Sequence, residues 1–122
     1  MWTYSQSTGK ITKDGTVIFG LGYSGKGQCK NDPNMQQLKG LGPIPRGRYT
    51  ISSFLAATST HGPDVLVLVP DAANQMFGRS GFLIHGDSKE HPGDASEGCI
   101  ILSSQIRLFI WASRDHILEV VE

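Results

Sequence analysis

The sequence predicts a single, mainly β domain with one well-formed helix late in the chain. Its 122 residues are the length of one domain, and 15 glycines and 6 prolines divide the chain into short segments. β-branched and aromatic runs of strand length lie between these turn residues. One window has helical spacing, with Ile106, Phe109 and Ile110 on one face. These observations favour a β-sandwich or mixed sheet over residues 1–122, with that helix packed against it.

The first part of the chain is predicted to form a meander of short strands. Its β-branched and aromatic runs indicate strands at residues 2–4, 10–12 and 16–23. Asp14-Gly15 lies between the second and third of these strands and is a strong signal for a hairpin turn. Strands that follow one another in the sequence are therefore expected to pair with each other.

A loop follows the meander, and a short helix is predicted near residues 33–39. Asp32 is a suitable helix cap, Pro33 suits the first helical position, and Gly40 lies just past the expected end. The next segment, residues 42–47, is predicted to be a rigid turn. Each of its two prolines fixes its own φ and restricts the residue before it.

The second half of the chain combines strands with the one helix. Strands are predicted at residues 48–52, 65–69, 81–85, 99–102 and 117–121. The helix is predicted to begin at Ser103 or Ser104, either of which can cap it, and to run through about Ser113. Its apolar face is expected to point inward, which places Arg107 and Arg114 on or near its outer side.

Charge and hydropathy narrow the classes of partner. The 11 Lys and Arg residues balance 11 Asp and Glu residues, so no attraction to nucleic acid or to an anionic membrane is expected. The N-terminus lacks the features of a signal peptide, and no apolar stretch approaches the roughly 20 residues of a membrane span. The chain is therefore expected to be made in the cytoplasm without a signal peptide, with no membrane insertion. It is expected either to work in the cytosol, to leave by a route that needs no leader, or to have been cut from a longer protein.

The clearest chemical signal lies between two predicted strands, in the segment from His85 to Cys99. A thiol is a strong nucleophile only as the thiolate, and a neighbouring imidazole can hold or take its proton. Backbone N–H groups around Gly98 and Cys99 suit the stabilisation of an oxyanion, and glycine permits the close approach that this requires. This pattern predicts a cysteine enzyme that forms a thioester and needs no metal or other cofactor.

The same residues allow other interpretations, which the sequence leaves open. Cys99 can simply begin a buried core strand, and His85 can be a structural histidine that bonds a backbone carbonyl. A disulfide between Cys29 and Cys99 would abolish the nucleophile, so the enzyme hypothesis predicts that these two residues are not joined. Possible zinc ligands are also present, at a spacing that matches no recognised site: His85, Asp87, His91 and Cys99.

Five ordered blocks, spread over nearly the whole chain, extend this pattern. They are Trp2-Thr3-Tyr4, Tyr23-Ser24-Gly25-x-Gly27, Gly42-Pro43-Ile44-Pro45-Arg46-Gly47, Gly78-Arg79-Ser80-Gly81-Phe82-Leu83-Ile84-His85-Gly86 and Ser96-Glu97-Gly98-Cys99. Together they resemble the L,D-transpeptidases of the YkuD type. The match is to the small L,D-transpeptidase and L,D-carboxypeptidase effectors that type VI secretion delivers. The resemblance implies one catalytic domain with an L,D-transpeptidase-like fold.

The resemblance also implies residue roles. Cys99 matches the nucleophile and His85 the base, while Ser96 and Gly98 complete the catalytic signature. The implied substrate-binding residues are Tyr23, Ser24, Arg79, Gly86 and Glu97. A guanidinium such as that of Arg79 suits a substrate carboxylate, because it can donate two parallel hydrogen bonds. The alternatives are an arginine that holds its own turn, and ordinary strand-end packing for Tyr23 and Ser24.

The implied substrate is the tetrapeptide stem of peptidoglycan, cleaved between meso-diaminopimelate and D-Ala or modified by exchange of D-Ala for another D-amino acid. The resemblance further implies an antibacterial toxin, delivered by a secretion apparatus to the periplasm of target Gram-negative cells, and a cognate immunity protein. Glu97 departs from the family pattern, because the large enzymes have a second histidine there. This departure gives weight to a non-catalytic peptidoglycan-binding module, and a zinc-dependent hydrolase is the third alternative.

Overall fold

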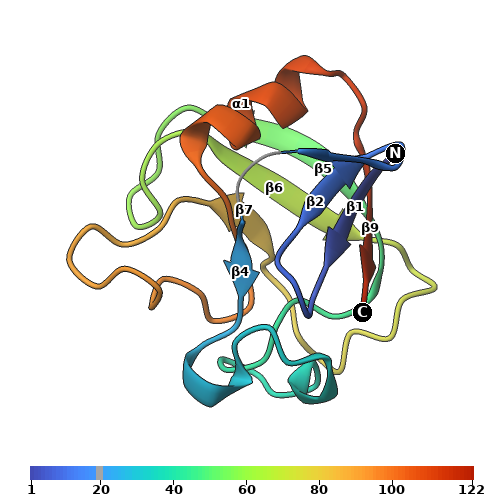
Figure 1. The fold of residues 1–122 in the computed structure, drawn as a ribbon, viewed down its shortest axis with the longest axis vertical. Helices are drawn as coiled ribbons and strands as arrows, with labels where there is room; N and C mark the ends of the chain where they lie inside the picture. The colour runs from blue at the N-terminus through green and yellow to red at the C-terminus, as the bar shows by residue number, and fades with distance from the viewer. Residues whose placement is uncertain (19–20) are drawn as a thin grey trace.

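The computed structural model describes residues 1–18 and 21–122, which form a curled mixed sheet around one helix (Figure 1). Its strands are β1 (Trp2–Ser5), β2 (Ile11–Lys13), β3 (Thr16–Ile18), β4 (Tyr23–Ser24), β5 (Gly47–Leu55), β6 (Val65–Pro70), β7 (Leu83–His85), β8 (Ile100–Ile101) and β9 (Ile117–Val121). The helix is α1 (Ser104–Ala112), and two 3₁₀ turns are η1 (Gly27–Cys29) and η2 (Pro33–Met35). The predicted mainly β class with one late helix is confirmed.

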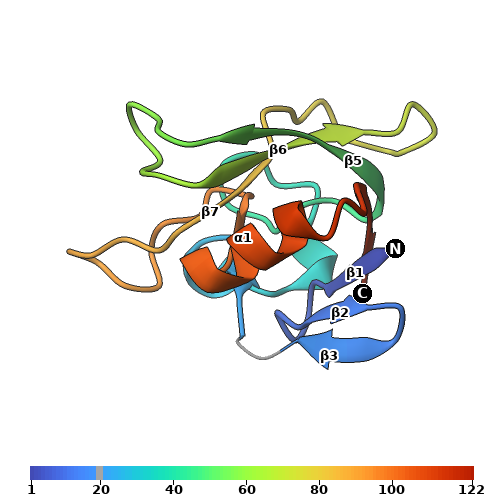
Figure 2. The ribbon, with the colours of Figure 1, turned by 90° about the horizontal axis from the view of Figure 1, so that it is seen from above.

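The strand order in the described sheet is β3-β2-β1-β9-β5-β6-β7-β8-β4. Two neighbouring pairs, β1 with β9 and β7 with β8, are parallel, and the others are antiparallel. The sheet curls so strongly that α1 lies between the layer of β5 and β6 and the layer of β1 to β3 (Figure 2). The parallel pair β7–β8 carries His85 and the residue after Cys99, and His85 and Cys99 are the two positions that the sequence singled out.

The N-terminal meander forms with one correction to its third strand. The hairpin at Asp14-Gly15 is present, and both residues have the positive φ that its turn requires. The strand predicted at residues 16–23 is wrong in its extent, because β3 ends at Ile18 and β4 begins separately at Tyr23. Part of that prediction, residues 19–20, lies outside the described residues. Gly22 instead donates its N–H to Gly9 O, which ties the chain to the first turn before β4.

The short helix predicted near residues 33–39 is also corrected. Only the 3₁₀ turn η2 forms, over Pro33–Met35. The cap was predicted correctly, since the Asp32 side chain accepts from the Asn34 N–H at 3.0 Å. The chain does not continue as a helix because Gly42 must pack against this segment. A Cβ at Gly42 would lie 1.8 Å from Met35 O, a contact that leaves no room for a side chain.

Helix α1 forms within the predicted bounds, but its faces differ from the prediction. Ser103 caps it by accepting from the Ile106 N–H at 3.3 Å. Ile106 and Ile110 are buried as expected, whereas Phe109 is 55% exposed and lies edge-on to Trp2. Arg107, expected on or near the outer side, is only 5% exposed. The helix therefore turns a guanidinium, rather than a third apolar side chain, toward the concave face of the sheet.

The hydrophobic core fills the space between the curled sheet and α1. Trp2 and Tyr4 from β1 meet Tyr49 and Ile51 from β5 there, and Ile110 closes the core from α1; all five are fully or almost fully buried. Because aromatic side chains bury the largest apolar areas, these contacts supply much of the driving force for folding. The core fixes the strands whose ends carry the polar residues described below. None of the described helices has the length and apolar content needed to cross a bilayer.

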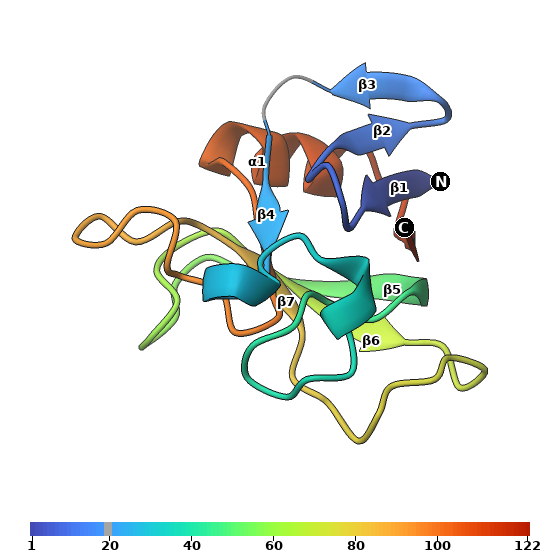
Figure 3. The ribbon, with the colours of Figure 1, turned by 60° about the horizontal axis from the view of Figure 1, so that its bottom comes forward.

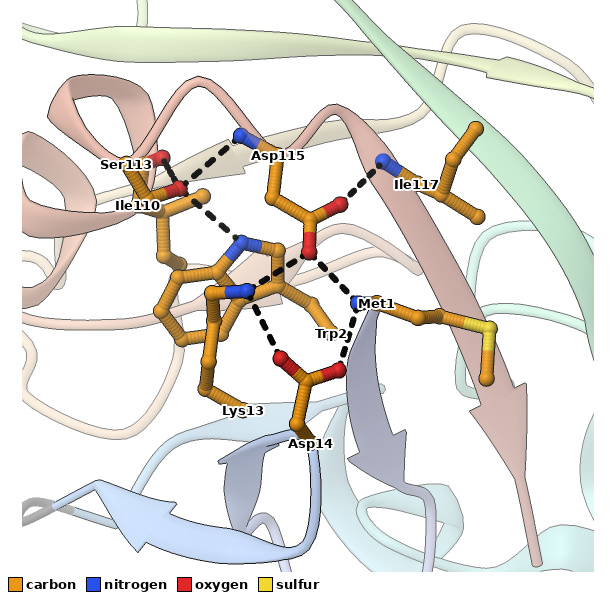
Figure 4. Close-up of polar contacts among 8 residues, drawn as sticks. All are labelled: Met1, Trp2, Lys13, Asp14, Ile110, Ser113, Asp115 and Ile117. Atoms are coloured by element: carbon orange, nitrogen blue, oxygen red, sulfur yellow. Dashed lines mark hydrogen bonds and ion pairs between the residues drawn. The ribbon is translucent and has the colours of Figure 1, made fainter.

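An ionic cluster lies where β1 and β2 meet the chain between α1 and β9 (Figure 4). The amino group of Met1 donates to Asp14 and Asp115, and Lys13 donates to the same two carboxylates at 3.0 and 2.7 Å. These two cations lower the pKa of Asp115, with the bond from Lys13 contributing most. The cluster is partly exposed and joins elements that are distant in the sequence.

Candidate active site

The register of the parallel strands β7 and β8 brings His85 and Cys99 together on one face of the sheet. Ile84 lies opposite Ile100 and His85 lies opposite Ile101, so Cys99 lies opposite Leu83. Side chains alternate between faces along a strand, and residues two apart share a face. His85, two residues after Leu83, therefore faces the same side as Cys99. Both line one pocket of about 1310 Å³.

The surroundings of His85 determine which of its ring nitrogens can act as a base. The ring is 4% exposed, and Nδ1 lies 2.9 Å from Gly86 O. A carbonyl oxygen only accepts hydrogen bonds, so Nδ1 carries the proton and Nε2 keeps its lone pair. Burial lowers the pKa of His85 and outweighs the opposing effect of the Gly86 bond; the nearby positive charge of Arg107 lowers it further. The imidazole is therefore neutral at pH 7 and able to accept a proton.

Cys99 is kept as a neutral thiol by its environment. Burial is the main cause that raises its pKa, and the negative charge of Glu97 adds to this. A backbone hydrogen bond from Leu83 and the positive charge of Arg79 act in the opposite direction. The Sγ–H points toward Gly81 O at 3.9 Å. In the resting site, a neutral thiol and a neutral imidazole thus line the same pocket, and deprotonation of the thiol requires a base.

Ser96 is a hydrogen-bonding hub that shapes the turn before the nucleophile. It is fully buried, and its hydroxyl donates to Cys99 O at 2.6 Å. The same oxygen accepts from the N–H groups of Gly25 and Gly98, at 2.9 and 3.1 Å. One hydroxyl therefore satisfies three backbone groups that would otherwise be buried without partners. Ser96 acts by positioning Cys99 and does not face the pocket.

Gly98 occupies a position that other residues do not fit. Its φ is 142°, a conformation that L side chains rarely adopt, and a Cβ there would lie 2.4 Å from Arg79 Nη2. Its N–H is already donated to Ser96, so the expectation that both N–H groups of Gly98 and Cys99 would serve an oxyanion needs a correction. The Cys99 N–H has no hydrogen-bond acceptor within residues 1–18 and 21–122 and is the available donor.

Tyr23 and Asp87 brace the loop that separates His85 from Cys99. The Tyr23 hydroxyl donates to Asp87 and accepts from the Ala95 N–H at 3.0 Å. Burial, with help from Asp87, raises the pKa of Tyr23 to about 12, so its hydroxyl keeps its proton. Asp87 also accepts from the N–H groups of Ser88 and Gly93. The loop after β7 extends from the sheet (Figure 3), and these bonds hold its base beside the pocket.

The other residues assigned to substrate binding occupy different places. Tyr23, Gly86 and Glu97 line the pocket with His85 and Cys99. Ser24 is fully buried behind Cys99: its hydroxyl donates to Gly98 O at 2.9 Å and accepts from the Ile44 N–H at 2.8 Å. Ser24 thus fits the alternative of strand-end packing, with no group left to contact a substrate.

Arg79 lines the pocket but uses its terminal nitrogens on the protein itself. Nη1 donates to Gln36 O and to Pro43 O, and Nη2 donates to Gly42 O and Glu97 O, at 2.9 and 3.2 Å. All four terminal N–H groups are thereby occupied, and the side chain is 5% exposed. This geometry favours the alternative of an arginine that holds its own turn. It fixes the loop before β5 to the residue that precedes Gly98.

Two pocket residues were not identified as functional from the sequence. His61, on the connection between β5 and β6, lies with its ring centroid 4.8 Å from that of His85. Arg107 reaches the pocket from α1. The only sequence signal for His61 is a lone histidine in a polar loop, and the helical pattern placed Arg107 on or near the outer side. Both become visible only when β7 is placed beside α1 and the β5–β6 connection.

The alternatives that involve Cys29 or zinc gain no support from the described residues. Cys29 and Cys99 are both free thiols. No group of three or more His, Cys, Asp or Glu side chains within residues 1–18 and 21–122 is placed to hold a metal ion. His91 lies on the exposed part of the loop, whereas His85 and Cys99 lie at the strand ends. The potential zinc ligands are therefore not gathered around one point.

Comparison with known families identifies the origin of this arrangement. A family model described as the Tlde1 domain matches residues 20–122. The chain belongs to the Tlde1 domain family. This is the type VI secretion L,D-transpeptidase effector family that the sequence resemblance predicted, and that prediction is confirmed. The match includes every residue of the Tlde1 site described above, from Tyr23 to Arg107. No curated protein matches the chain.

Two solved structures show the same fold as this Tlde1 domain. L,D-transpeptidase 1 of Mycobacterium tuberculosis has 17% sequence identity and a TM-score of 0.56 over 99% of this chain and 60% of its own. An L,D-transpeptidase from Mycobacterium smegmatis has 17% identity and a TM-score of 0.53 over 99% and 58%. The chain thus spans about 60% of the length of these structures. The predicted L,D-transpeptidase-like fold is confirmed.

Proposed function

We propose that this Tlde1 domain is a cysteine L,D-carboxypeptidase or L,D-transpeptidase that acts on the tetrapeptide stems of peptidoglycan. The observation that carries the proposal is the pairing of Cys99 with His85 on one face of β7 and β8, at the floor of an open pocket. The free Nε2 of His85 and the free N–H of Cys99 supply the base and the oxyanion donor that acyl transfer needs.

The first half-reaction forms a thioester. His85 Nε2 takes the thiol proton as Cys99 Sγ attacks the carbonyl carbon between meso-diaminopimelate and D-Ala. The Cys99 N–H donates to the resulting oxyanion. When the tetrahedral intermediate collapses, the C–N bond breaks and His85 gives its proton to the leaving amine of D-Ala. The acyl group then remains on Cys99, and D-Ala departs.

The second half-reaction releases the acyl group. A water molecule or the amine of another D-amino acid attacks the thioester, and His85 accepts a proton from it. The C–S bond breaks, and the thiolate recovers that proton from the imidazolium. Water yields the tripeptide, whereas a D-amino acid yields an exchanged stem. Both products lack the D-Ala bond from which a crosslink is made, which is a rationale for toxicity.

The biological setting is part of the proposal, and the observation that supports it is membership of the Tlde1 domain family. An effector of type VI secretion would be made in the cytoplasm, handed to the secretion apparatus and delivered to the periplasm of a target Gram-negative cell. A cognate immunity protein would protect the producing cell, and a surface that covers the pocket would suit it. Peptidoglycan stems and D-amino acids are the substrates in this proposal, with no cofactor, nucleic acid or membrane insertion.

Muropeptide analysis tests the chemistry directly. Wild-type protein, Cys99→Ala and His85→Ala are incubated with tetrapeptide-rich sacculi, with and without D-methionine. We expect tripeptides or exchanged stems from wild type and a loss of at least 10³-fold in the two variants, as for other paired nucleophiles and bases. Cys29→Ser is the matched control and is expected to keep full activity. Unaltered trimming by Cys99→Ala contradicts the mechanism, and binding to sacculi without any product would favour the peptidoglycan-binding module.

A further inference from the structure

The pocket contains a cation with a terminal nitrogen that the protein does not use. Arg107 Nε donates to Leu102 O and Ser103 O, and Nη1 donates to Pro63 O and Asp64 O, both at 2.8 Å. Nη2 donates to no acceptor within residues 1–18 and 21–122. The residue as a whole is only 5% exposed, but Nη2 keeps some contact with the pocket space, so its free N–H groups are open to a ligand.

The unpaired nitrogen lies beside the catalytic histidine. A Cβ built on Gly86 would lie 2.9 Å from Arg107 Nη2, so the backbone after His85 is the surface against which the guanidinium rests. Gly86, His85 and Arg107 all line the same pocket. The charge of Arg107 is close enough to His85 to affect its proton affinity. The absence of a side chain at Gly86 leaves room for Nη2 and for a ligand that would reach it.

The groups in the pocket follow one another in a defined order. Cys99 lies opposite Leu83, His85 lies two residues further along β7, and Gly86 with Arg107 Nη2 comes next. In a peptide that ends in D-Ala, the scissile carbonyl carbon is followed by the amide nitrogen, the α-carbon and the terminal carboxylate. Cys99, the nucleophile, meets the scissile carbonyl carbon, and His85, the acid, meets the amide nitrogen. The terminal carboxylate comes next along the peptide, and Arg107 comes next along the pocket after His85.

We propose that Arg107 binds the terminal carboxylate of the D-amino acid that leaves or enters the thioester. The inference rests on the proposed function and adds its substrate requirement: a free α-carboxylate on the residue after the scissile bond. It applies equally to the departing D-Ala and to an incoming D-amino acid, because both place an amine at His85. A guanidinium N–H that donates to a carboxylate is a charge-assisted hydrogen bond, which is among the stronger contacts available to a small ligand.

The neighbouring charges do not already neutralise this nitrogen. Asp64 contacts Arg107 through its backbone oxygen, and its side chain contributes a modest attractive charge. Asp87 is turned toward Tyr23 and the loop backbone, with which it forms its hydrogen bonds. Arg79, the other buried arginine, has its terminal N–H groups occupied. Lys39 and Lys89 also line the pocket, but both are exposed at its surface. Among the described residues, Arg107 is thus the buried pocket cation with a spare terminal donor for an anion.

A comparison of two substrates tests the inference in the wild-type protein. One is the tetrapeptide that ends in D-Ala, and the other is the same peptide ending in D-alaninamide, which lacks the charge. We expect kcat/KM to fall by about 10- to 100-fold for the amide, the range for a lost hydrogen bond between charged groups. In the exchange reaction, D-methionine is expected to be a better acceptor than D-methioninamide by a similar factor.

Two variants assign the effect to Arg107. In Arg107→Gln, and in Gly86→Ala, whose new methyl group crowds Nη2, the ratio of acid to amide rates is expected to fall toward one. Arg48→Gln, which removes an exposed arginine far from the pocket, should keep the wild-type ratio. The ratio is unaffected by a partial loss of folded protein, and Gly86→Ala keeps every hydrogen bond of Arg107 to the backbone available.

The outcomes separate this inference from the proposed function. Equal wild-type rates on the acid and the amide overturn the role of Arg107, as does a wild-type preference that persists in both variants. In either case, trimming of the acid substrate that depends on Cys99 still supports the proposed enzyme. If no trimming depends on Cys99, the enzyme itself fails.

Discussion

Two buried arginines flank the pocket and use their donors differently. Arg79 gives all four terminal N–H groups to carbonyl oxygens of residues 36, 42, 43 and 97, and keeps only its single Nε–H. Arg107 donates from Nε and Nη1 to carbonyl oxygens, and its Nη2 has no acceptor in the part of the chain that the structure describes. Both are equally buried, at 5% exposure. Burial of a charged residue in an active site therefore does not by itself indicate ligand binding, and the count of unused donors is the better guide.

The difference arises from what each side chain has to join. Arg79 lies on a loop and connects two other loops, so every terminal donor has a carbonyl to satisfy. Arg107 extends from α1, and among the described residues it bonds only the two residues just before the helix and the chain before β6. A helix supports one side of the guanidinium and leaves the other side open to the pocket. Replacement of each arginine should therefore have a different consequence: loss of stability for Arg79 and loss of carboxylate preference for Arg107.

The largest effect is expected from Arg79→Gln. Glutamine cannot reach four carbonyl oxygens, and those oxygens would remain buried without donors. We expect the free energy of unfolding to fall by roughly 3 kcal/mol or more, because hydrogen bonds to a charged group contribute about 1.5–3 kcal/mol each and unpaired buried groups add a penalty. Equilibrium unfolding in urea measures the change, with Arg48→Gln as the control for loss of an exposed arginine.

Arg79→Gln also tests whether Arg79 and Arg107 differ in their effect on substrate preference. The fraction of Arg79→Gln that remains folded should keep the preference for a terminal carboxylate, because the terminal donors of Arg79 do not face the ligand. Loss of this preference in Arg79→Gln together with its retention in Arg107→Gln would reverse the roles assigned to the two residues.

A second, intermediate effect concerns the charge state of Cys99. Burial raises the pKa of this thiol more than the nearby Arg79 charge lowers it, and burial keeps His85 neutral. We therefore expect the rate of iodoacetamide alkylation of Cys99 to rise about tenfold per pH unit from pH 6 to 8, with no plateau in that range. The measurement uses Cys29→Ser, so that Cys99 is the single thiol.

The pH profile has a clear alternative outcome. A preformed thiolate–imidazolium pair would react at a constant rate between pH 6 and 8, and His85→Ala would abolish that reactivity. For a neutral pair, His85→Ala is expected to change the alkylation rate by less than about threefold. The enzymatic activity is expected to depend on pH through His85. Because burial lowers the pKa of His85, the imidazole stops acting as a base only when the pH falls below about 6.5, the ordinary pKa of histidine.

The smallest effect is expected at the exposed ionic cluster around Asp115. Its pKa is lowered in the folded state, so its contribution is complete above the unfolded pKa of about 3.9 and is lost as the pH falls below it. Asp115→Asn should lower the free energy of unfolding at pH 7 by less than about 1 kcal/mol, because water screens the pairs. Urea unfolding at pH 7 and pH 3 measures this, with Glu90→Gln as control. If Asp115→Asn lowered the free energy of unfolding as much as Arg79→Gln, burial would not explain the difference between the ionic cluster and the buried arginine.

The sequence predicted that His85 and Cys99 would lie near each other, because the ends of the two strands can be recognised in it. An apolar run that ends at His85 and another that starts after Cys99 require a connecting loop, and pairing of the two strands brings the residues together. The five matching blocks added the family and the fold. Ser96 and Gly98 were identified by that pattern, but their physical roles, a buried hydrogen-bonding hub and a backbone at positive φ, follow only from three-dimensional contacts.

Other expectations failed where distant segments decide the outcome. The periodicity of α1 predicted Phe109 inside and Arg107 on or near the outer side, because it cannot show that the concave face contains a polar pocket. The helix near residues 33–39 stops early because Gly42 packs onto it. Arg79 was assigned to a substrate carboxylate, although the carbonyls that occupy it come from segments about 40 residues away. Local pattern does not specify which partners a long polar side chain finds.

The parallel pairing of β7 and β8 has a consequence for how this protein can change. A one-residue slip between the strands would turn Cys99 to the opposite face and abolish the site, so the strands tolerate no insertion or deletion. The loop between them is different, since residues 89–92 are exposed and lie beyond the bonds that Tyr23 and Asp87 make to its base. Its tip can lengthen, shorten or carry a grafted peptide without moving either reacting group. Natural variation and engineering should therefore accumulate at this tip, where changes leave the positions of His85 and Cys99 intact.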